Sequence, residues 1–372
     1  MNFEFDAATA PAWLQPQPAP TAVALPAHCY VDAAFQMFER DAVFARSWQL
    51  VGRAEQVAGN GDHIVAEVAG VPLVIVRGDD GVLRALHNVC RHRAGPLATC
   101  DAQGARALTC KYHGWTYALD GTLRGAPEMG RAQDFDVAAI RLPQAHVALW
   151  RGLVFTALGD VPTFEAFVAG IETRVGTTVE ALEFAHRVTY DVACDWKVYD
   201  VACDWKVYVD NFLEGYHLPQ VHPQLNALLD YRSYGTELAN WFVLQSSPLD
   251  RDNSLYGAGE ALYYWLYPNT MLNVLPGRLQ TNRVWPLGAG RCRVEFDFFY
   301  ALRDANRDAD AQFSELVQQE DIAICEAVQR GLASGSYTAG RLNPAREQGV
   351  WQFHELLRAA YRSAVQPGSA AR

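Results

Sequence analysis

The sequence lacks any apolar run close to the roughly 20 residues of a membrane-spanning helix. The segment Val71–Val76 has the length of a strand, and Ala148–Leu158 is interrupted by Arg151. The N-terminus carries Glu4 and Asp6, where a secretory signal would carry Lys or Arg. We therefore expect a cytoplasmic protein that does not associate with a membrane.

Positive charge is also scarce. The sequence has 31 Lys and Arg against 42 Asp and Glu, which gives a net charge of −11. Such a chain repels phosphate backbones, which argues against nucleic-acid binding. The dinucleotide-binding pattern G-x-G-x-x-G is missing too, since Gly59 and Gly61 lack the third glycine. The sequence thus offers no site of this type for a nicotinamide cofactor.

Hydrophobic and aromatic residues are plentiful. They make up 50% and 12% of the 372 residues, which is enough for a large core with aromatic pockets. The length suits one large or two ordinary domains. The chain has eight cysteines, and in a cytoplasmic protein these indicate metal binding or buried thiols before disulfides.

The pattern along the chain predicts three parts: an N-terminal tail and helix (1–45), a small antiparallel β domain (46–155) and a domain with strands and long helices (156–372). This order predicts an α+β protein. The expected helices are 33–48, 163–174, 309–332 and 346–365. The expected strands are 63–68, 72–77, 82–86, 187–192, 235–245, 277–286 and 291–299.

One segment occurs twice in direct succession, since residues 191–199 and 200–208 both read DVACDWKVY. Two copies of nine residues are too few and too short for a solenoid, so we interpret them as a tandem duplication. We expect the second copy to occupy the structural position, because it keeps Trp205 and Lys206 at fixed spacing from Asn211. The first copy is then expected to bulge out and to reduce stability and activity.

The strongest motif is a matched pair of cysteine–histidine loops. Cys90 and His92 form the first loop, Cys110 and His113 form the second, and 17 residues lie between His92 and Cys110. Two thiolates and two imidazoles are the ligands of a Rieske [2Fe–2S] cluster. The competing metal is zinc, but zinc fingers favour both cysteines on one loop.

A second constellation, DNFLEGYH, covers residues 210–217 and is followed by His222. Glu214 and His217 are expected on one face of a helix that Pro219 ends, so that His222 can turn back towards His217. Two histidines and one carboxylate form the facial triad of non-haem Fe(II) enzymes.

The residues alone leave two points of this second site open. The third ligand could be Asp321, Glu320 or Glu326, all in one expected helix. A di-iron site would pair two E-x-x-H motifs, and Glu183 and His186 form a second one. Because 187–192 alternates like a strand, we interpret this second motif as structural.

These segments resemble the α subunits of Rieske non-haem iron oxygenases, the aromatic ring-hydroxylating dioxygenase family. The resemblance rests on NVCRHR (88–93), CKYHGW (110–115) and DNFLEGYH, and spans about 25–361. Within the family the chain is most similar to the branch of choline monooxygenase and other quaternary-amine monooxygenases. That similarity lies in Glu214, YPNTMLN (267–273), TNRVWPLG (281–288) and VQRGL (328–332).

The resemblance implies a Rieske domain followed by a helix-grip (START-like) catalytic domain, commonly assembled as a trimer. It implies a [2Fe–2S] cluster on Cys90, His92, Cys110 and His113, and mononuclear Fe(II) on His217, His222 and Asp321. Glu214 would link His217 to His113 of the partner subunit, and Asn211 would lie near the iron.

The activity implied is that of a terminal oxygenase, which uses O2 and electrons from a separate NAD(P)H-dependent reductase to hydroxylate a small molecule. The branch points to a quaternary amine of the choline, betaine or carnitine type. An aromatic cage for such a cation could come from Tyr263, Tyr264, Trp265 and Tyr267. The alternatives are ring hydroxylation of an aromatic compound or acid, or a non-catalytic Rieske electron carrier.

Overall fold

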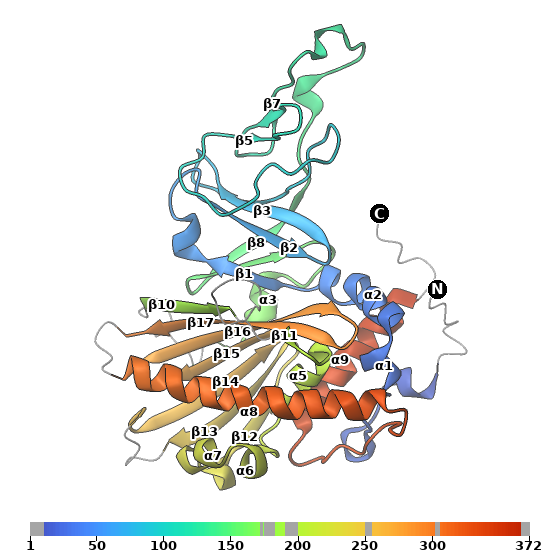
Figure 1. Cartoon of the computed structure of the whole chain (residues 1–372), viewed down its shortest axis with the longest axis vertical. Coiled ribbons are helices and arrows are strands. Elements are labelled where there is room, and N and C mark those ends of the chain that lie inside the picture. The colour runs from blue at the N-terminus through green and yellow to red at the C-terminus, as the bar shows by residue number, and fades with distance from the viewer. Residues whose placement is uncertain are drawn as a thin grey trace. The chain divides into compact units, whose positions relative to one another are not determined.

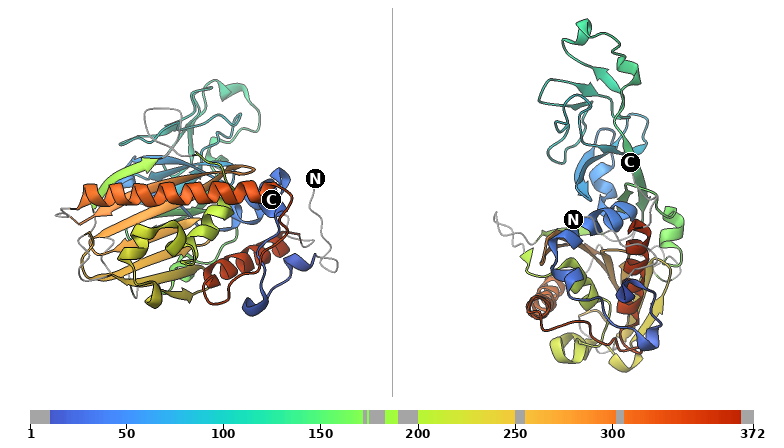
Figure 2. Two further views of the ribbon diagram at one scale, coloured as in Figure 1. Left: turned by 60° about the horizontal axis from the view of Figure 1, so that its bottom comes forward. Right: turned by 90° about the vertical axis from the view of Figure 1, so that its right-hand side faces the viewer.

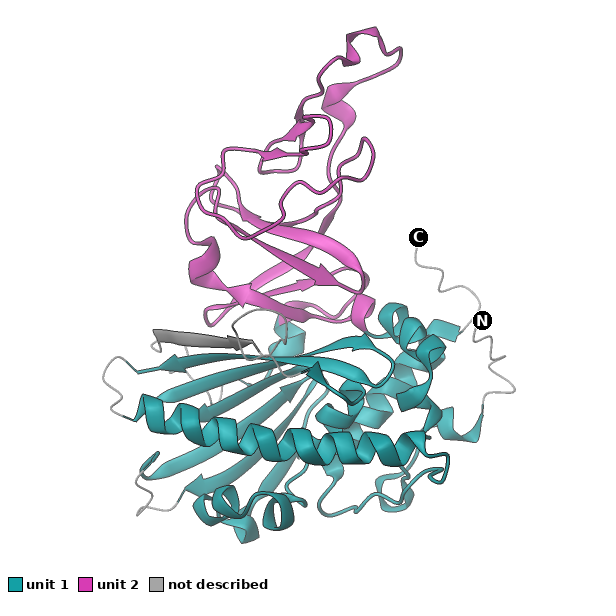
Figure 3. Cartoon of the chain, viewed as in Figure 1, with its two compact units in different colours: residues 1–43, 165–372 teal, residues 44–164 magenta. Residues whose placement is uncertain are grey.

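We describe residues 11–171, 174, 183–189, 200–249, 255–301 and 306–365 in a computed structural model of the chain (Figure 1). The chain divides into two compact units, unit 1 with residues 1–43 and 165–372 and unit 2 with residues 44–164 (Figure 3). The N-terminal segment thus groups with the C-terminal part of the chain, whereas the sequence suggested a separate tail. Within the described residues no helix is both long and apolar enough to cross a membrane.

Unit 2 is built from two antiparallel sheets, with strand orders β1-β9-β8-β4-β3-β2 and β5-β6-β7. The strands of the larger sheet are β1 (Gln49–Arg53), β2 (His63–Val68), β3 (Val71–Arg77), β4 (Leu83–His87), β8 (Gln144–Trp150) and β9 (Leu153–Ala157). Those of the smaller sheet are β5 (Leu108–Thr109), β6 (Thr116–Tyr117) and β7 (Leu123–Gly125). Short 3-10 helices cover Phe44–Arg46, Ala54–Val57, Met129–Arg131 and Val137–Ala139.

The hairpin between β2 and β3 shows how local sequence determines this unit. Val68 pairs with Val71, and the two turn residues Ala69 and Gly70 have φ values of 50° and 77°. Two positive φ angles in a two-residue turn match the right-handed twist of the flanking strands. Inward-facing Ile64 and Leu73 then pack in one apolar core, and the expected small antiparallel β domain is confirmed.

Unit 1 contains an antiparallel sheet in the order β10-β17-β16-β15-β14-β13-β12, with β11 paired to β17. Its strands are β10 (Glu183–Thr189), β11 (Asp200–Val201), β12 (Gly235–Leu238), β13 (Phe242–Leu249), β14 (Gly259–Leu266), β15 (Thr270–Leu275), β16 (Arg278–Gly288) and β17 (Arg291–Tyr300). The long helix α8 (Arg307–Ala333) runs across these strands, as the two views of Figures 1 and 2 show.

The other helices of unit 1 are shorter. They are α1 (His28–Val31), α2 (Ala33–Ala42), α3 (Phe164–Val168), α5 (Trp205–Phe212), α6 (Leu218–Val221), α7 (Pro223–Leu228), α9 (Gln348–Val365) and the 3-10 helices Ala12–Leu14, Ala19–Thr21 and Tyr231–Ser233. The long helices agree with the expected ranges, and the α+β class is confirmed. The single strand expected at 235–245 was wrong, because Ala239 donates to the Phe242 carbonyl at 3.0 Å and turns the chain into a hairpin.

The second copy of the duplicated segment forms β11 and the first half of α5, as expected, whereas the first copy lies outside the described residues. Asp204 caps α5 by accepting from the backbone N–H of Lys206 at 3.0 Å. The buried Lys206 ammonium lies 2.7 Å from Asp204 and 2.8 Å from Glu39 of α2. This ion cluster connects the N-terminal segment to α5.

Candidate metal centres

The two cysteine–histidine loops of unit 2 follow the same backbone path. Cys90 N–H donates to the Gly95 carbonyl, and Ala94 N–H donates to the Cys90 carbonyl, both at 2.9 Å. In the second loop Cys110 makes the equivalent bonds with Trp115 and Gly114, also at 2.9 Å. Ala94 and Gly114 both have positive φ, 57° and 72°. The repeated geometry presents one thiol and one imidazole from each loop in the same way.

The two cysteines and the two histidines differ in burial, in the way that a Rieske cluster requires. Cys90 and Cys110 are buried, whereas His92 and His113 are exposed, with ring centroids 4.6 Å apart. A Cβ atom added at Gly95 would lie 2.8 Å from the Cys110 sulfur, so the first loop passes directly over that thiol. Two inner sulfurs and two outer imidazoles fit the ligand set of a [2Fe–2S] cluster.

The second centre lies in unit 1, where the local structure differs from the expected helix. We predicted Glu214 and His217 on one helical face, but α5 ends at Phe212 and both residues lie in the link before α6. The Glu214 carboxylate accepts from the backbone N–H groups of Tyr216 and His217. These bonds replace helical ones, because a side-chain acceptor competes with the backbone carbonyls.

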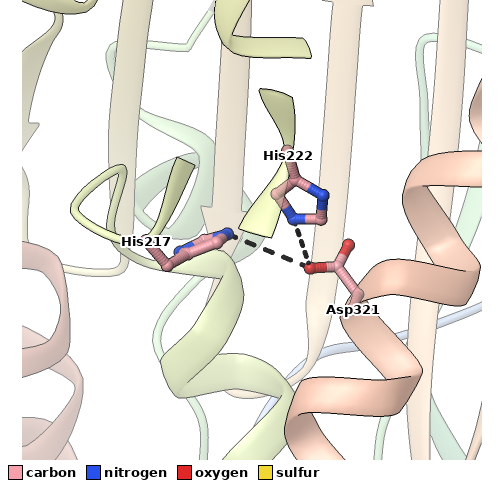
Figure 4. A group of neighbouring side chains, drawn as sticks. All are labelled: His217, His222 and Asp321. Atoms are coloured by element: carbon pink, nitrogen blue, oxygen red, sulfur yellow. Dashed lines mark hydrogen bonds and ion pairs between the residues drawn. The ribbon is translucent and has the colours of Figure 1, made fainter. Parts of the chain in front are cut away.

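His217, His222 and Asp321 nevertheless converge (Figure 4). One ligand atom from each lies within 4.8 Å of the others. His222 Nε2 is 2.9 Å and His217 Nε2 is 3.9 Å from the same Asp321 oxygen, Oδ1. The structure thus brings the three predicted residues together. His217 and His222 come from the α5–α7 region, and Asp321 comes from α8.

Each of the two imidazoles has a carboxylate next to its Nδ1 atom. His217 Nδ1 lies 2.7 Å from Glu214 Oε1, and His222 Nδ1 lies 2.7 Å from Glu320 Oε2. Burial lowers the pKa of His222, but its contacts with Asp321 and Glu320 outweigh burial and raise the pKa above its ordinary value. Metal-binding histidines typically have such a partner on the second nitrogen, which leaves Nε2 for the ion. Two imidazoles and a carboxylate fit mononuclear Fe(II).

Of the other residues that the sequence singled out, some lie next to the triad and others lie outside the site. Asn211 Nδ2 donates to Asp321 Oδ1 at 2.6 Å, so this residue lies next to the triad as expected. Glu326 accepts from the Ala202 backbone N–H at 3.1 Å and does not join the site. Glu183 and His186 fall within strand β10, which agrees with the structural interpretation of that motif. Sequence reasoning missed Glu320 as a partner of His222.

A cavity between α8 and the sheet borders the triad. Asp321 and Gln318 line it from α8, and Tyr263, Asn273 and Gln280 line it from the sheet. Of the expected aromatic cage only Tyr263 lines this cavity. Tyr264 points to the other face of β14, and Trp265 and Tyr267 pack against each other and, through Trp265, against Phe353. Rings from other elements, including Phe212, Tyr234, Tyr256, Phe296 and Phe313, complete the lining.

Comparison with known families identifies both units. Residues 47–144 match the Rieske [2Fe-2S] domain, and residues 179–363 match the catalytic domain of the ring-hydroxylating alpha subunit. A cluster domain joined to an iron-binding catalytic domain defines an oxidoreductase that uses O2. The chain belongs to the Rieske oxygenase family, and its cofactors are a Rieske [2Fe–2S] cluster and mononuclear iron.

Relatives and a solved structure support this assignment over most of the chain. The chain is 34% identical to choline monooxygenase of Arabidopsis thaliana, covering 89% of this chain and 81% of the relative. It is 28% identical to the carnitine monooxygenase oxygenase subunit of Escherichia coli K12, covering 91% and 94%. The structure of a quaternary ammonium Rieske monooxygenase, described with carnitine oxidation and inter-subunit electron transfer, matches with 26% identity and a TM-score of 0.81, covering 93% and 99%.

Proposed function

We propose that this chain is the oxygenase component of an enzyme that hydroxylates a quaternary amine with O2, using electrons from a separate NAD(P)H-dependent reductase. The observation that carries the proposal is the convergence of His217, His222 and Asp321 at the edge of a cavity lined by aromatic rings and polar side chains. Aromatic faces attract quaternary ammonium groups. The similarity to choline and carnitine monooxygenases points to the same substrate class.

The site residues have separate roles in this proposal. When bound, mononuclear iron supplies O2 activation and hydroxylation of a C–H bond. Glu214 and Glu320 accept from the Nδ1–H groups of His217 and His222, so each Nε2 lone pair is directed to the ion. Asn211 holds Asp321 Oδ1 through its amide and restricts the carboxylate to one orientation.

The charges also support electron transfer between subunits of a homotrimer. Around the exposed His92 and His113 of the cluster loops lie the exposed cations Arg91, Arg93 and Lys111. A second cavity, which His217 also lines, contains three acids, Asp210, Glu214 and Glu347, and one cation, Arg341. Opposite potentials favour docking of the loops of one chain at this cavity of the next. Glu214 would then contact the partner subunit's His113.

Turnover with a surrogate reductase tests the function. The holoenzyme is supplied with NADH, a reductase and either quaternary amines or aromatic acids, and substrate-dependent NADH use and product mass are recorded. We expect oxidation of at least one quaternary amine. Oxidation of aromatic acids alone would replace the proposed substrate class, and no turnover of either class would contradict the proposed function.

A further inference from the structure

One row of side chains runs across the sheet beneath the metal centre. Gln245 pairs with Tyr263, Tyr263 with Asn273, and Asn273 with Gln280, on neighbouring strands β13 to β16. Directly paired residues of an antiparallel sheet point to the same face. All four line the cavity that borders the triad, so they form a continuous polar and aromatic strip along one wall.

Several polar atoms of this cavity have no hydrogen-bond partner among the described residues. These buried atoms belong to side chains that all line the cavity, and they are Gln245 Oε1, Asn273 Oδ1, Arg278 Nε and Gln318 Nε2. Buried polar groups in folded proteins are almost always paired with protein or water. The two donors and two acceptors left open around one cavity can therefore pair with polar groups of a ligand or with water.

Other contacts fix the orientation of Gln245, Gln318 and Arg278. Gln245 Nε2 donates to the Phe212 carbonyl at 2.7 Å, and Gln318 Oε1 accepts from the Tyr208 hydroxyl at 2.7 Å. The terminal nitrogens of Arg278 donate to Asp310, Tyr256 and Gln280, whereas its Nε has no partner among the described residues.

The charge of Arg278 is compensated within the protein. Its guanidinium and the carboxylate of Asp310 form a buried ion pair, 5% and 2% exposed. Among the described residues Arg278 is the sole Lys or Arg that lines the cavity. The Arg278 end of the cavity thus offers hydrogen-bond donors without net positive charge.

This end lies far from Asp321 of the triad. Asp310 and Asp321 lie eleven positions apart on the same helix α8, which corresponds to about 16.5 Å along its axis. Arg278 and Asn273 lie on adjacent strands as diagonal neighbours, since Asn273 pairs with Gln280 and Arg278 precedes it by two. Long side chains in this arrangement reach the same ligand group.

We propose, on the basis of the quaternary-amine function above, that Arg278 and Asn273 form a subsite for an uncharged hydroxyl at the far end of the substrate. A hydroxyl accepts from Arg278 Nε–H and donates to Asn273 Oδ1, so it satisfies both open atoms. A carboxylate accepts only, and it would place negative charge against Asn273 Oδ1 and beside Asp310. The subsite selects long quaternary amino alcohols over zwitterions of equal length.

Three probes of matched chain length test the subsite: pentyltrimethylammonium, (4-hydroxybutyl)trimethylammonium and 4-(trimethylammonio)butanoate. Binding to the holoenzyme is measured by calorimetry, and turnover by kcat/KM. We expect the hydroxyl probe to exceed each of the others by about tenfold, the value of one well-formed hydrogen bond. Equal values for the three probes, or preference for the carboxylate, would overturn the subsite.

Single substitutions test which residues produce the preference for the hydroxyl probe. Asn273→Leu should reduce the preference for hydroxyl over pentyl about tenfold, because the acceptor is lost. Asp310→Asn leaves the Arg278 charge uncompensated and should shift the preference towards the carboxylate. If Asp310→Asn does not fold, the three probes and the Asn273→Leu variant still test the subsite. The matched control is Tyr264→Phe, which loses a buried, unpartnered hydroxyl outside the cavity and should keep the preference.

The outcomes distinguish this subsite from the proposed function. Oxidation of all three probes with equal efficiency overturns the subsite and leaves quaternary-amine oxidation intact. Failure of all three to bind or to be oxidised, together with choline and carnitine, overturns the proposed function and the subsite with it. An Asn273→Leu variant that binds every probe as the parent does contradicts the assignment of Asn273.

Discussion

The Nδ1 atom of His222 lies 2.7 Å from Oε2 of Glu320, while Nε2 of the same ring lies 2.9 Å from Oδ1 of Asp321. Two consecutive acids on α8 therefore face opposite nitrogens of one buried imidazole. The sequence left both as candidate ligands. From this geometry we propose that Asp321 is the metal ligand and that Glu320 holds the other nitrogen of the ring.

Glu320→Gln should weaken iron binding without abolishing it. The amide oxygen still accepts from His222 Nδ1–H, but the negative charge that raises the basicity of the ring is lost. Loss of such a partner typically lowers metal affinity about 10–100-fold. Competition with an iron chelator measures the change. Glu326→Gln, six residues further along α8, is the matched control because Glu326 contacts the Ala202 backbone. If both variants kept their iron equally well against the chelator, the role of Glu320 would be contradicted.

Cys90→Ser should remove the cluster and all turnover, because a serine oxygen is a poor substitute for a thiolate ligand of iron. The visible spectrum of the purified protein reports the cluster directly. Cys100→Ser is the control, since Cys100 is exposed and lies outside the two loops. A Cys90→Ser protein with the parent spectrum and activity would refute the ligand assignment, and a colourless parent protein would favour zinc.

Lys206→Met should destabilise unit 1 by about 3–5 kcal/mol, because the change leaves Glu39 and Asp204 buried without their cation. Denaturant unfolding, followed by tryptophan fluorescence, measures the loss. Arg40→Met on the same helix as Glu39 is the control, since Arg40 pairs with an exposed Asp41. Similar stability of the two variants would show that the buried cluster does not hold α2 to α5.

Deletion of residues 191–199 should raise the melting temperature and preserve or increase activity. The second copy supplies the described contacts of α5, including the Lys206 cluster and the Asp204 cap, and we expect the core to form without the first. Thermal melts and turnover compare the parent, the deletion and a variant with nine Gly and Ser residues in place of the first copy. A deletion protein that melts below the parent would show that the duplication is structural.

Much of this arrangement could be predicted from the sequence, and the exceptions have physical causes. Ligand spacing is local, so Cys90, His92, Cys110, His113, His217 and His222 were found without the fold. The position of Asp321 needed the family resemblance, because its separation of 99 residues from His222 carries no periodic signal. The helix expected through Glu214 failed because this side chain takes backbone N–H groups that a helix would use.

The aromatic cage shows a different limit. Tyr263, Tyr264, Trp265 and Tyr267 are neighbours in the sequence, but strand alternation sends Tyr263 to the cavity and Tyr264 to the other face. The rings that accompany Tyr263 come from distant elements. No local pattern connects Phe212 of α5 with Phe296 of β17 or Phe313 of α8.

Iron counting in the Asp321→Ala variant tests the central claim most directly, namely that one chain holds a Rieske cluster and a separate mononuclear iron on His217, His222 and Asp321. We expect about three irons per chain in the parent and about two in the variant, with the visible spectrum of the cluster unchanged. Oxygen-dependent turnover should be lost with the third iron. A variant that keeps three irons per chain, or that loses the cluster spectrum together with its iron, would contradict the account.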